Sequence, residues 1–311
     1  MKNKEFTTHA GCVKTENRQS AGLELNPALV KLEMLNKCSA NLTSLQEYYN
    51  ENLADFENSV ISPEEIEIIQ EAFFEKLMAL EELNPLKEDV EQAYDVKDTA
   101  PFSYMGMKSL KEVELADDLV PGYGDGVKQV LPFSFTKSSL EKISVPDCCD
   151  FIGAYAFAGT HLKEIDLTPV NRTGLIVQQG AFMDCKYLKR VHGMHDLNID
   201  SREFEGCISL AEIEVSDYVF RISNRAFKGC KSLTHFVFSE SLLELDDEAF
   251  AGCTNLEMVR FLGKELESFG DGVFTGCPLK EVIVPEGYRE FYEGILPSSL
   301  ASVIVESNDN Q

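Results

Sequence analysis

One phrase returns along the chain at a short and nearly fixed interval. It reads Ala-Phe-x-x-Cys-x-x-Leu-x-x-Φ-x-Φ, where Φ is an apolar residue, and its clearest copies begin at Ala226 and Ala249. A period of this length is the signature of stacked repeats, each of which buries its apolar side against the next. The sequence therefore predicts a solenoid. An open solenoid seldom encloses a pocket, so the prediction favours binding over catalysis.

The aromatic residue of the phrase locates about eight repeats between residues 100 and 306. After a first step of 31 residues, the aromatics follow one another at 22 to 25 residues. Two of the longer steps contain loops, at 121–126 and 168–174, which are expected to project as contact points. The repeat aromatics are Tyr104, Phe135, Phe157, Phe182, Phe204, Phe227, Phe250 and Phe274.

Each repeat carries two apolar segments, which predict two strands. The alternation in Leu210…Ile213…Val215 is typical of a strand with one buried face, and Val219…Ile222 indicates a shorter second strand. Equivalent residues of stacked strands lie about 4.8 Å apart. Five cysteines share one position and should form a file of buried thiols, because side chains that point in parallel make neither disulfides nor a metal site. They are Cys185, Cys207, Cys230, Cys253 and Cys277.

These phrases resemble the BspA-type leucine-rich repeat family over about two-thirds of the chain. The resemblance implies a curved, non-catalytic solenoid that binds proteins, and many members look like bacterial or protozoan surface proteins that adhere to partners. The predicted fold class is α+β, a leucine-rich repeat β-solenoid of about eight BspA-type repeats with an N-terminal α-helical domain. The helical part resembles no family.

Residues 26–98 are predicted to form that helical domain, between a flexible tail at 1–25 and the repeats at 100–306; 307–311 form a second tail. Asn26-Pro27 starts one helix, a second covers 40–57, and the capping box at 62–65 opens a third. A short helix through Val90 and Tyr94 is expected to follow. The domain is expected to cap the first repeat, or else to bind a partner or dimerise through the wide apolar face of 66–80.

The formal net charge of −25 disfavours nucleic acid as a partner, because an acidic surface repels phosphate. Partner surfaces should be neutral or basic. No apolar run is long enough to cross a bilayer, and residues 1–25 lack the apolar stretch of a secretory signal. We expect a cytoplasmic protein, or a cell-surface or secreted one if a leader is missing. The oligomeric state is not predicted.

The outward positions of the long strands form the candidate binding face, which is expected to be the concave face of the solenoid. They flank the middle aliphatic residue of each strand, and stacking should align them into continuous columns. A solvated charge ladder is the plain interpretation; a recognition face is the functional one, because Met and Arg are enriched in interface cores. The proposed partner-binding residues are Arg190, His192, Glu212, Glu214, His235, Met258 and Arg260.

Motifs for chemistry are weak. His192-Gly193-Met194-His195 follows Cys185 but does not converge on a metal, and acidic neighbours should blunt any reactivity of the Cys148-Cys149 pair. No phosphate loop or nucleophile elbow occurs. The sequence predicts no enzyme, no cofactor and no metal, but a protein-interaction module of the adhesion or scaffold type. The alternative is an inhibitor or immunity-type regulator that blocks an enzyme or toxin.

Overall fold

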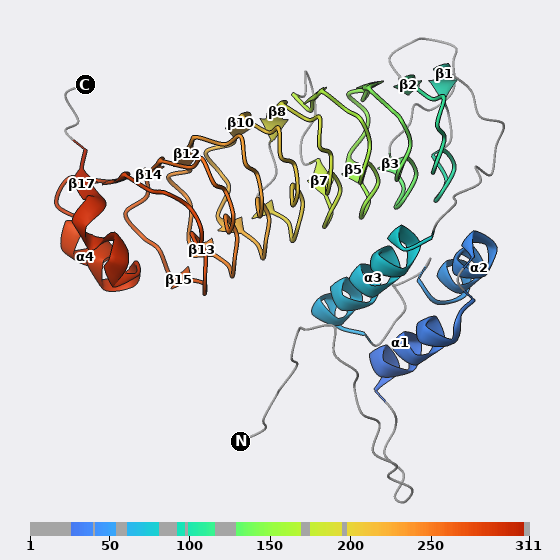
Figure 1. Ribbon diagram of the computed structural model, residues 1–311, viewed down its shortest axis with the longest axis horizontal. Coiled ribbons are helices and arrows are strands. Elements are labelled where there is room, and N and C mark those ends of the chain that lie inside the picture. The colour runs from blue at the N-terminus through green and yellow to red at the C-terminus, as the bar shows by residue number, and fades with distance from the viewer. Residues whose placement is uncertain are drawn as a thin grey trace, which may run out of the picture.

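The computed structural model describes residues 26–39, 41–53, 61–80, 92–96, 99–115, 129–168, 175–194 and 198–307. Figure 1 shows a solenoid whose successive coils carry one strand on each of two sides, with three helices beside its N-terminal half. The predicted solenoid with N-terminal helices is confirmed. The tail at 1–25, most of 307–311 and most of the two predicted contact loops lie outside the described residues.

The longer strands stack in parallel along one side, which we call the long-strand face. They form three sheets in the orders β1-β2-β4, β6-β8-β10 and β12-β14-β16-β17. Their bounds are β1 Gln92–Val96, β2 Glu112–Leu115, β4 Lys142–Ser144, β6 Glu164–Asp166, β8 Arg190–Met194, β10 Glu212–Val215, β12 His235–Phe238, β14 Met258–Phe261, β16 Glu281–Val284 and β17 Ile304–Glu306.

The second side consists of two-residue strands, as the shorter apolar segments predicted. They form two parallel sheets, β3-β5-β7 and β9-β11-β13-β15. Their bounds are β3 Gln129–Val130, β5 Phe151–Ile152, β7 Ile176–Val177, β9 Asn198–Ile199, β11 Arg221–Ile222, β13 Glu244–Leu245 and β15 Ser268–Phe269.

A file of stacked aromatic rings runs through the core. From Tyr104 to Phe250, neighbouring repeat aromatics have ring centroids 5.0–5.5 Å apart with nearly parallel planes. Phe274 continues the file at 5.8 Å with a tilted ring. The ring separation follows from the spacing of the strands. The repeat phrase therefore specifies one coil per copy, as predicted.

The predicted helical region contains α1 (Pro27–Lys37), α2 (Leu42–Asn52) and α3 (Pro63–Met78). Asn26 caps α1 by accepting from the amide of Ala28, and Ser62 and Glu65 form the predicted capping box of α3. Leu35, Leu45, Ile69, Phe73 and Leu77 are buried among these helices. The short helix expected through Tyr94 is wrong: this residue lies in β1, which pairs with β2, while Val90 lies outside the described residues. The solenoid sheet therefore begins before residue 100.

The C-terminal end of the array carries a short helix that the sequence analysis did not predict. Helix α4 (Arg289–Ile295) and a 3-10 turn at Ser298–Val303 precede β17. Tyr292 of α4 packs on Phe261, and its hydroxyl donates to the carbonyl of Gly263 at 2.9 Å. The helix therefore covers core residues of the last coils, as expected of a terminal cap.

A line of turns, which we call the turn ridge, runs along the solenoid, and the helices contact its N-terminal half. Its residues stand two positions before each repeat aromatic, and all have φ between 55° and 69°. Glycine adopts this conformation freely, and other residues adopt it at a cost. The ridge comprises Phe102, Phe133, Tyr155, Gly180, Arg202, Arg225, Glu248 and Gly272.

Helix α3 lies lengthwise along this ridge (Figure 1). The Nζ of Lys137 donates to the carbonyl of Met78, Tyr155 stacks on Phe74 at 4.1 Å, and Gln179 bonds to Gln70 at 2.7 Å. Successive contacts are four residues apart along α3 and one repeat apart along the solenoid. Four helical residues advance about 6 Å, close to the spacing of the coils. Phe74, which could have served a coiled-coil contact, is buried against the chain itself.

Candidate protein-binding face

Within its sheets the long-strand face has the register that the sequence predicted, except that the pairing of β8 with β10 shifts after Ile213. Glu164 lies opposite Arg190, which lies opposite Glu212, and Asp166 lies opposite His192. Further along, His235 lies opposite Met258, and Val237 lies opposite Arg260. Outward side chains of consecutive strands therefore stand side by side in columns, interrupted where the sheets are interrupted.

Opposite charges pair along the first two sheets. The Arg190 guanidinium donates to Glu164 at 2.8 Å, and Lys142 donates to Glu112 at 2.6 Å. The pKa of Glu164 is lowered, because its carboxylate accepts a hydrogen bond from Arg190. These pairs are exposed, so each adds little to folding stability. These ion pairs fix the positions of charged side chains on a surface that is available to a binding partner.

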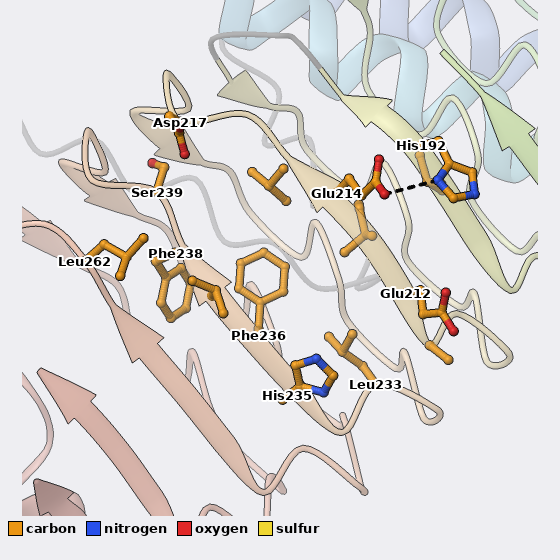
Figure 2. A pocket seen from close by; sticks show the side chains of 15 residues that line it. His192, Glu212, Glu214, Asp217, Leu233, His235, Phe236, Phe238, Ser239 and Leu262 are labelled. Carbon is orange, nitrogen blue, oxygen red and sulfur yellow. Dashed lines mark ion pairs between the residues drawn. The ribbon is translucent and has the colours of Figure 1, made fainter. Parts of the chain in front are cut away.

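The face opens between β10 and β12. These strands belong to different sheets, whereas the short strands β11 and β13 on the second side remain paired. A cleft of about 350 Å³ lies at this break. Figure 2 shows the side chains from β8, β10 and β12 that surround it. Four of the seven predicted partner-binding residues line the cleft: His192, Glu212, Glu214 and His235.

Aromatic packing explains why β12 joins the later coils. Phe236 contacts Phe227 and Phe250, with ring centroids 5.2 and 4.8 Å apart, and Phe238 stacks on Phe261 at 4.4 Å. Both inward side chains of β12 therefore pack within their own coil and toward the C-terminus. The inward residues of β10 are consequently only half-buried, unlike those of β12.

Within the cleft, the side chains present both charge and apolar surface. His192 Nδ1 lies 3.3 Å from Glu214 Oε1, as the dashed line in Figure 2 marks. His235 Nδ1 lies 3.1 Å from the hydroxyl of Thr234. Val237, two residues after His235 on β12, is exposed. The contribution of Asp217 and Leu262 to the cleft was missed by sequence reasoning, because they follow the strands and only the break brings them to it.

The remaining predicted residues lie beside the cleft and not in its lining. Arg190 is engaged with Glu164, and Met258 and Arg260 lie half-buried on β14. The inward pair Phe236 and Phe238, where other strands carry mostly smaller residues, is the sequence signal that could have located the break.

The five cysteines stand in file, as predicted, and are buried except Cys277, which is half-buried. The Sγ of each cysteine donates to the backbone carbonyl of the aromatic residue in the previous repeat. For Cys207 and Phe182 the distance is 3.1 Å. Burial raises the pKa of the Cys185 thiol to about 12, so the thiolate needed for nucleophilic attack is disfavoured. The file is structural.

The other candidate chemical sites do not form in the described part of the chain. His195 of the weak metal motif lies outside the described residues, and the described His, Cys, Asp and Glu side chains form no group that could hold a metal ion. Cys149 is buried, as its register predicted. Among the described helices, none is long and apolar enough to cross a membrane.

Comparison with known proteins agrees with the repeat phrase. The model of the BspA type leucine rich repeat region matches residues 94–198 and 175–300 in six copies, which together span more than half of the chain. No curated protein matches the sequence.

Several solved structures are similar to the chain. A leucine-rich repeat protein from Bacteroides ovatus is 22% identical, with 71% of this chain and 67% of that chain covered and a TM-score of 0.42. A leucine-rich cell surface protein from Faecalibacterium prausnitzii is 16% identical, with coverages of 63% and 64% and a TM-score of 0.39. The pneumococcal vaccine antigen PcpA is 15% identical, with coverages of 73% and 90% and a TM-score of 0.32.

Proposed function

Because the chain belongs to the BspA-type leucine-rich repeat family, we propose that it binds a protein partner through the long-strand face, as a non-catalytic module of the adhesion or scaffold type. The observation that carries the proposal is the alignment of outward side chains across consecutive strands. Columns of this kind offer an extended surface whose charges and apolar groups have fixed spacing, which is how repeat proteins recognise other proteins.

The contact residues in this proposal are Arg190, His192, Glu212, Glu214, His235, Met258 and Arg260. They combine an aligned charge pattern with Met258 and the exposed Val237, an arrangement suited to an interface with an apolar centre and a charged rim. With a net charge of −25, the protein should associate fastest with neutral or basic surfaces.

A charge-reversal experiment tests the face. Peptide ligands selected from a random library, or a partner isolated from native extract, are bound to the wild type and to the double variant Arg190→Glu/Arg260→Glu by biolayer interferometry. We expect affinity to fall by about tenfold or more, with a nearly unchanged melting temperature, because both side chains lie at the surface.

The matched control, Lys186→Glu/Lys231→Glu, reverses the charge of two exposed lysines. Each lies in the turn directly after a cysteine of the file. It makes the same change in net charge away from the face and should leave binding within about twofold of wild type. Equal losses in both double variants would mean that overall charge, and not the face, governs binding. Normal binding by the Arg190/Arg260 variant would contradict the assignment.

A further inference from the structure

The break between β10 and β12 is a wedge, open at the long-strand face and closed behind it. On the second side, β9, β11 and β13 remain hydrogen-bonded, and the rings of Phe204 and Phe227 stay 5.4 Å apart. The long strands also part between β4 and β6, and from β6 to β17 the step from β10 to β12 is the one at which the described long strands do not pair. The cleft therefore follows from the packing of this repeat pair.

The floor of the wedge is apolar. Ile213 and Val215, which point inward from β10, remain half-buried, whereas Val191 of β8 and Val259 of β14, which are equivalent to Ile213, are fully buried. Val237 adds a side chain that is 43% exposed. Apolar surface of this kind gains free energy when a ligand covers it.

The rim of the wedge is acidic. Glu212, Glu214 and Asp217 line it, and Glu214 faces His192. In the part of the chain that the structure describes, Glu212 and Asp217 form no ion pair, and Arg190, which lies opposite Glu212, donates to Glu164. The only other titratable side chain in the lining is His235, whose ring contacts Thr234. Three carboxylates thus line the cleft beside an apolar floor.

We propose that the wedge between β10 and β12 binds an arginine or lysine side chain of an extended, basic segment of a partner protein. The aliphatic stem would cover Ile213, Val215 and Val237, and the cationic end would reach the carboxylates of Glu212 and Glu214, which both point outward from β10. Long basic side chains combine these properties, because their stems pack on apolar surface while the charge stays in water. The cleft volume of about 350 Å³ suits one side chain and its flanking backbone.

The inference rests on the proposed protein-binding function and assigns the chemistry of its ligand. Its test uses the full chain and two short extended peptides that differ at one position: a central arginine flanked by leucine and threonine, and its glutamate counterpart. Fluorescence anisotropy should show that the arginine peptide binds about tenfold more tightly or better, and that this preference shrinks with added salt.

Two variant pairs localise the binding. The double variant Glu212→Lys/Glu214→Lys should bind the arginine peptide about tenfold more weakly or worse. The control Glu114→Lys/Glu281→Lys makes the same charge change elsewhere on the face, and its affinity should stay within about twofold of wild type. Val237→Ser should weaken it by about threefold, and Val305→Ser, at a valine of β17 that is 38% exposed, should not.

Equal affinity for the two peptides, no binding of the arginine peptide, or equal losses in both lysine variants would overturn the inference. These results leave the proposed function standing if library-selected ligands still lose affinity to the Arg190→Glu/Arg260→Glu protein. If those ligands are also insensitive to that change, the proposed function fails as well.

Discussion

The turn ridge has two halves with the same backbone and different side chains. In the N-terminal half, Phe102, Phe133 and Tyr155 are buried under the helices. In the C-terminal half, the same position holds Arg225 and Glu248, which pair with each other near solvent at 2.7 Å. All five residues have positive φ, so the conformation does not explain the choice of side chain. The cover does.

Gly180 and Arg202 mark the transition between the halves. A Cβ on Gly180 would lie 2.2 Å from the Tyr155 ring, so the aromatic of one repeat leaves no room at the next. Arg202 is buried and pairs with Glu71 of α3 and with Glu205. The ridge therefore changes from aromatic to charged where α3 begins, and the comparison shows how one repeat position is adapted to its neighbour.

The largest expected effect separates the two halves directly. Phe133→Ala should lower the free energy of unfolding by about 3–5 kcal/mol, because its fully buried ring contacts Tyr49, Phe73 and Phe102. Arg225→Ala should lower it by less than about 1 kcal/mol, because its pairs are partly exposed. Urea unfolding measures both, and alanine keeps a Cβ at the positive φ in each case. Similar small losses would show that the helices add little to the ridge.

An intermediate effect is expected at the transition. A double-mutant cycle on Arg202→Ala and Glu71→Gln should give a coupling of about 1–2 kcal/mol, because only 11% of the Arg202 side chain is exposed. The same cycle on Arg225→Ala and Glu248→Gln provides the matched, exposed pair and should give less than about 1 kcal/mol. Equal couplings would contradict the shielding of Arg202 by α3.

The smallest expected effect is a pH dependence of the covered half. Burial, together with the nearby carboxylate of Asp200, raises the pKa of Glu67 on α3 from 4.5 to about 7. The folded protein therefore keeps a proton that the unfolded chain has lost between these pH values. Stability from this group is full at low pH and is lost as pH rises toward 7, by about 1 kcal/mol after allowing for solvent screening.

Thermal unfolding between pH 4.5 and 7 measures this slope. Glu67→Gln should flatten it, whereas Glu114→Gln, an exposed change on the long-strand face, should not. If the Glu67→Gln variant keeps the same pH dependence of stability, a group other than Glu67 takes up the proton.

Much of the fold could be predicted because the repeat phrase combines three local signals. The aromatic, the cysteine and the strand residues each recur at one position, so a single coil implies all of them. Tyr94 could not be placed correctly, because its segment lacks the phrase and its pairing with β2 is a contact distant in sequence. Helix α4 was missed for the same reason.

The candidate site was predicted in part. The columns of outward residues follow from strand alternation and were expected. The cleft depends on how Phe236 and Phe238 pack against later coils, and this required the coordinates.

By itself, the sequence determined a stacked solenoid with an aromatic file, a thiol file and two strands per coil, because a repeating apolar pattern can bury itself in one way only, coil upon coil. The tertiary structure decided where the helices lie and where the long strands part. Both depend on side chains from distant segments that compete for the same space, and no periodic pattern encodes the outcome of that competition.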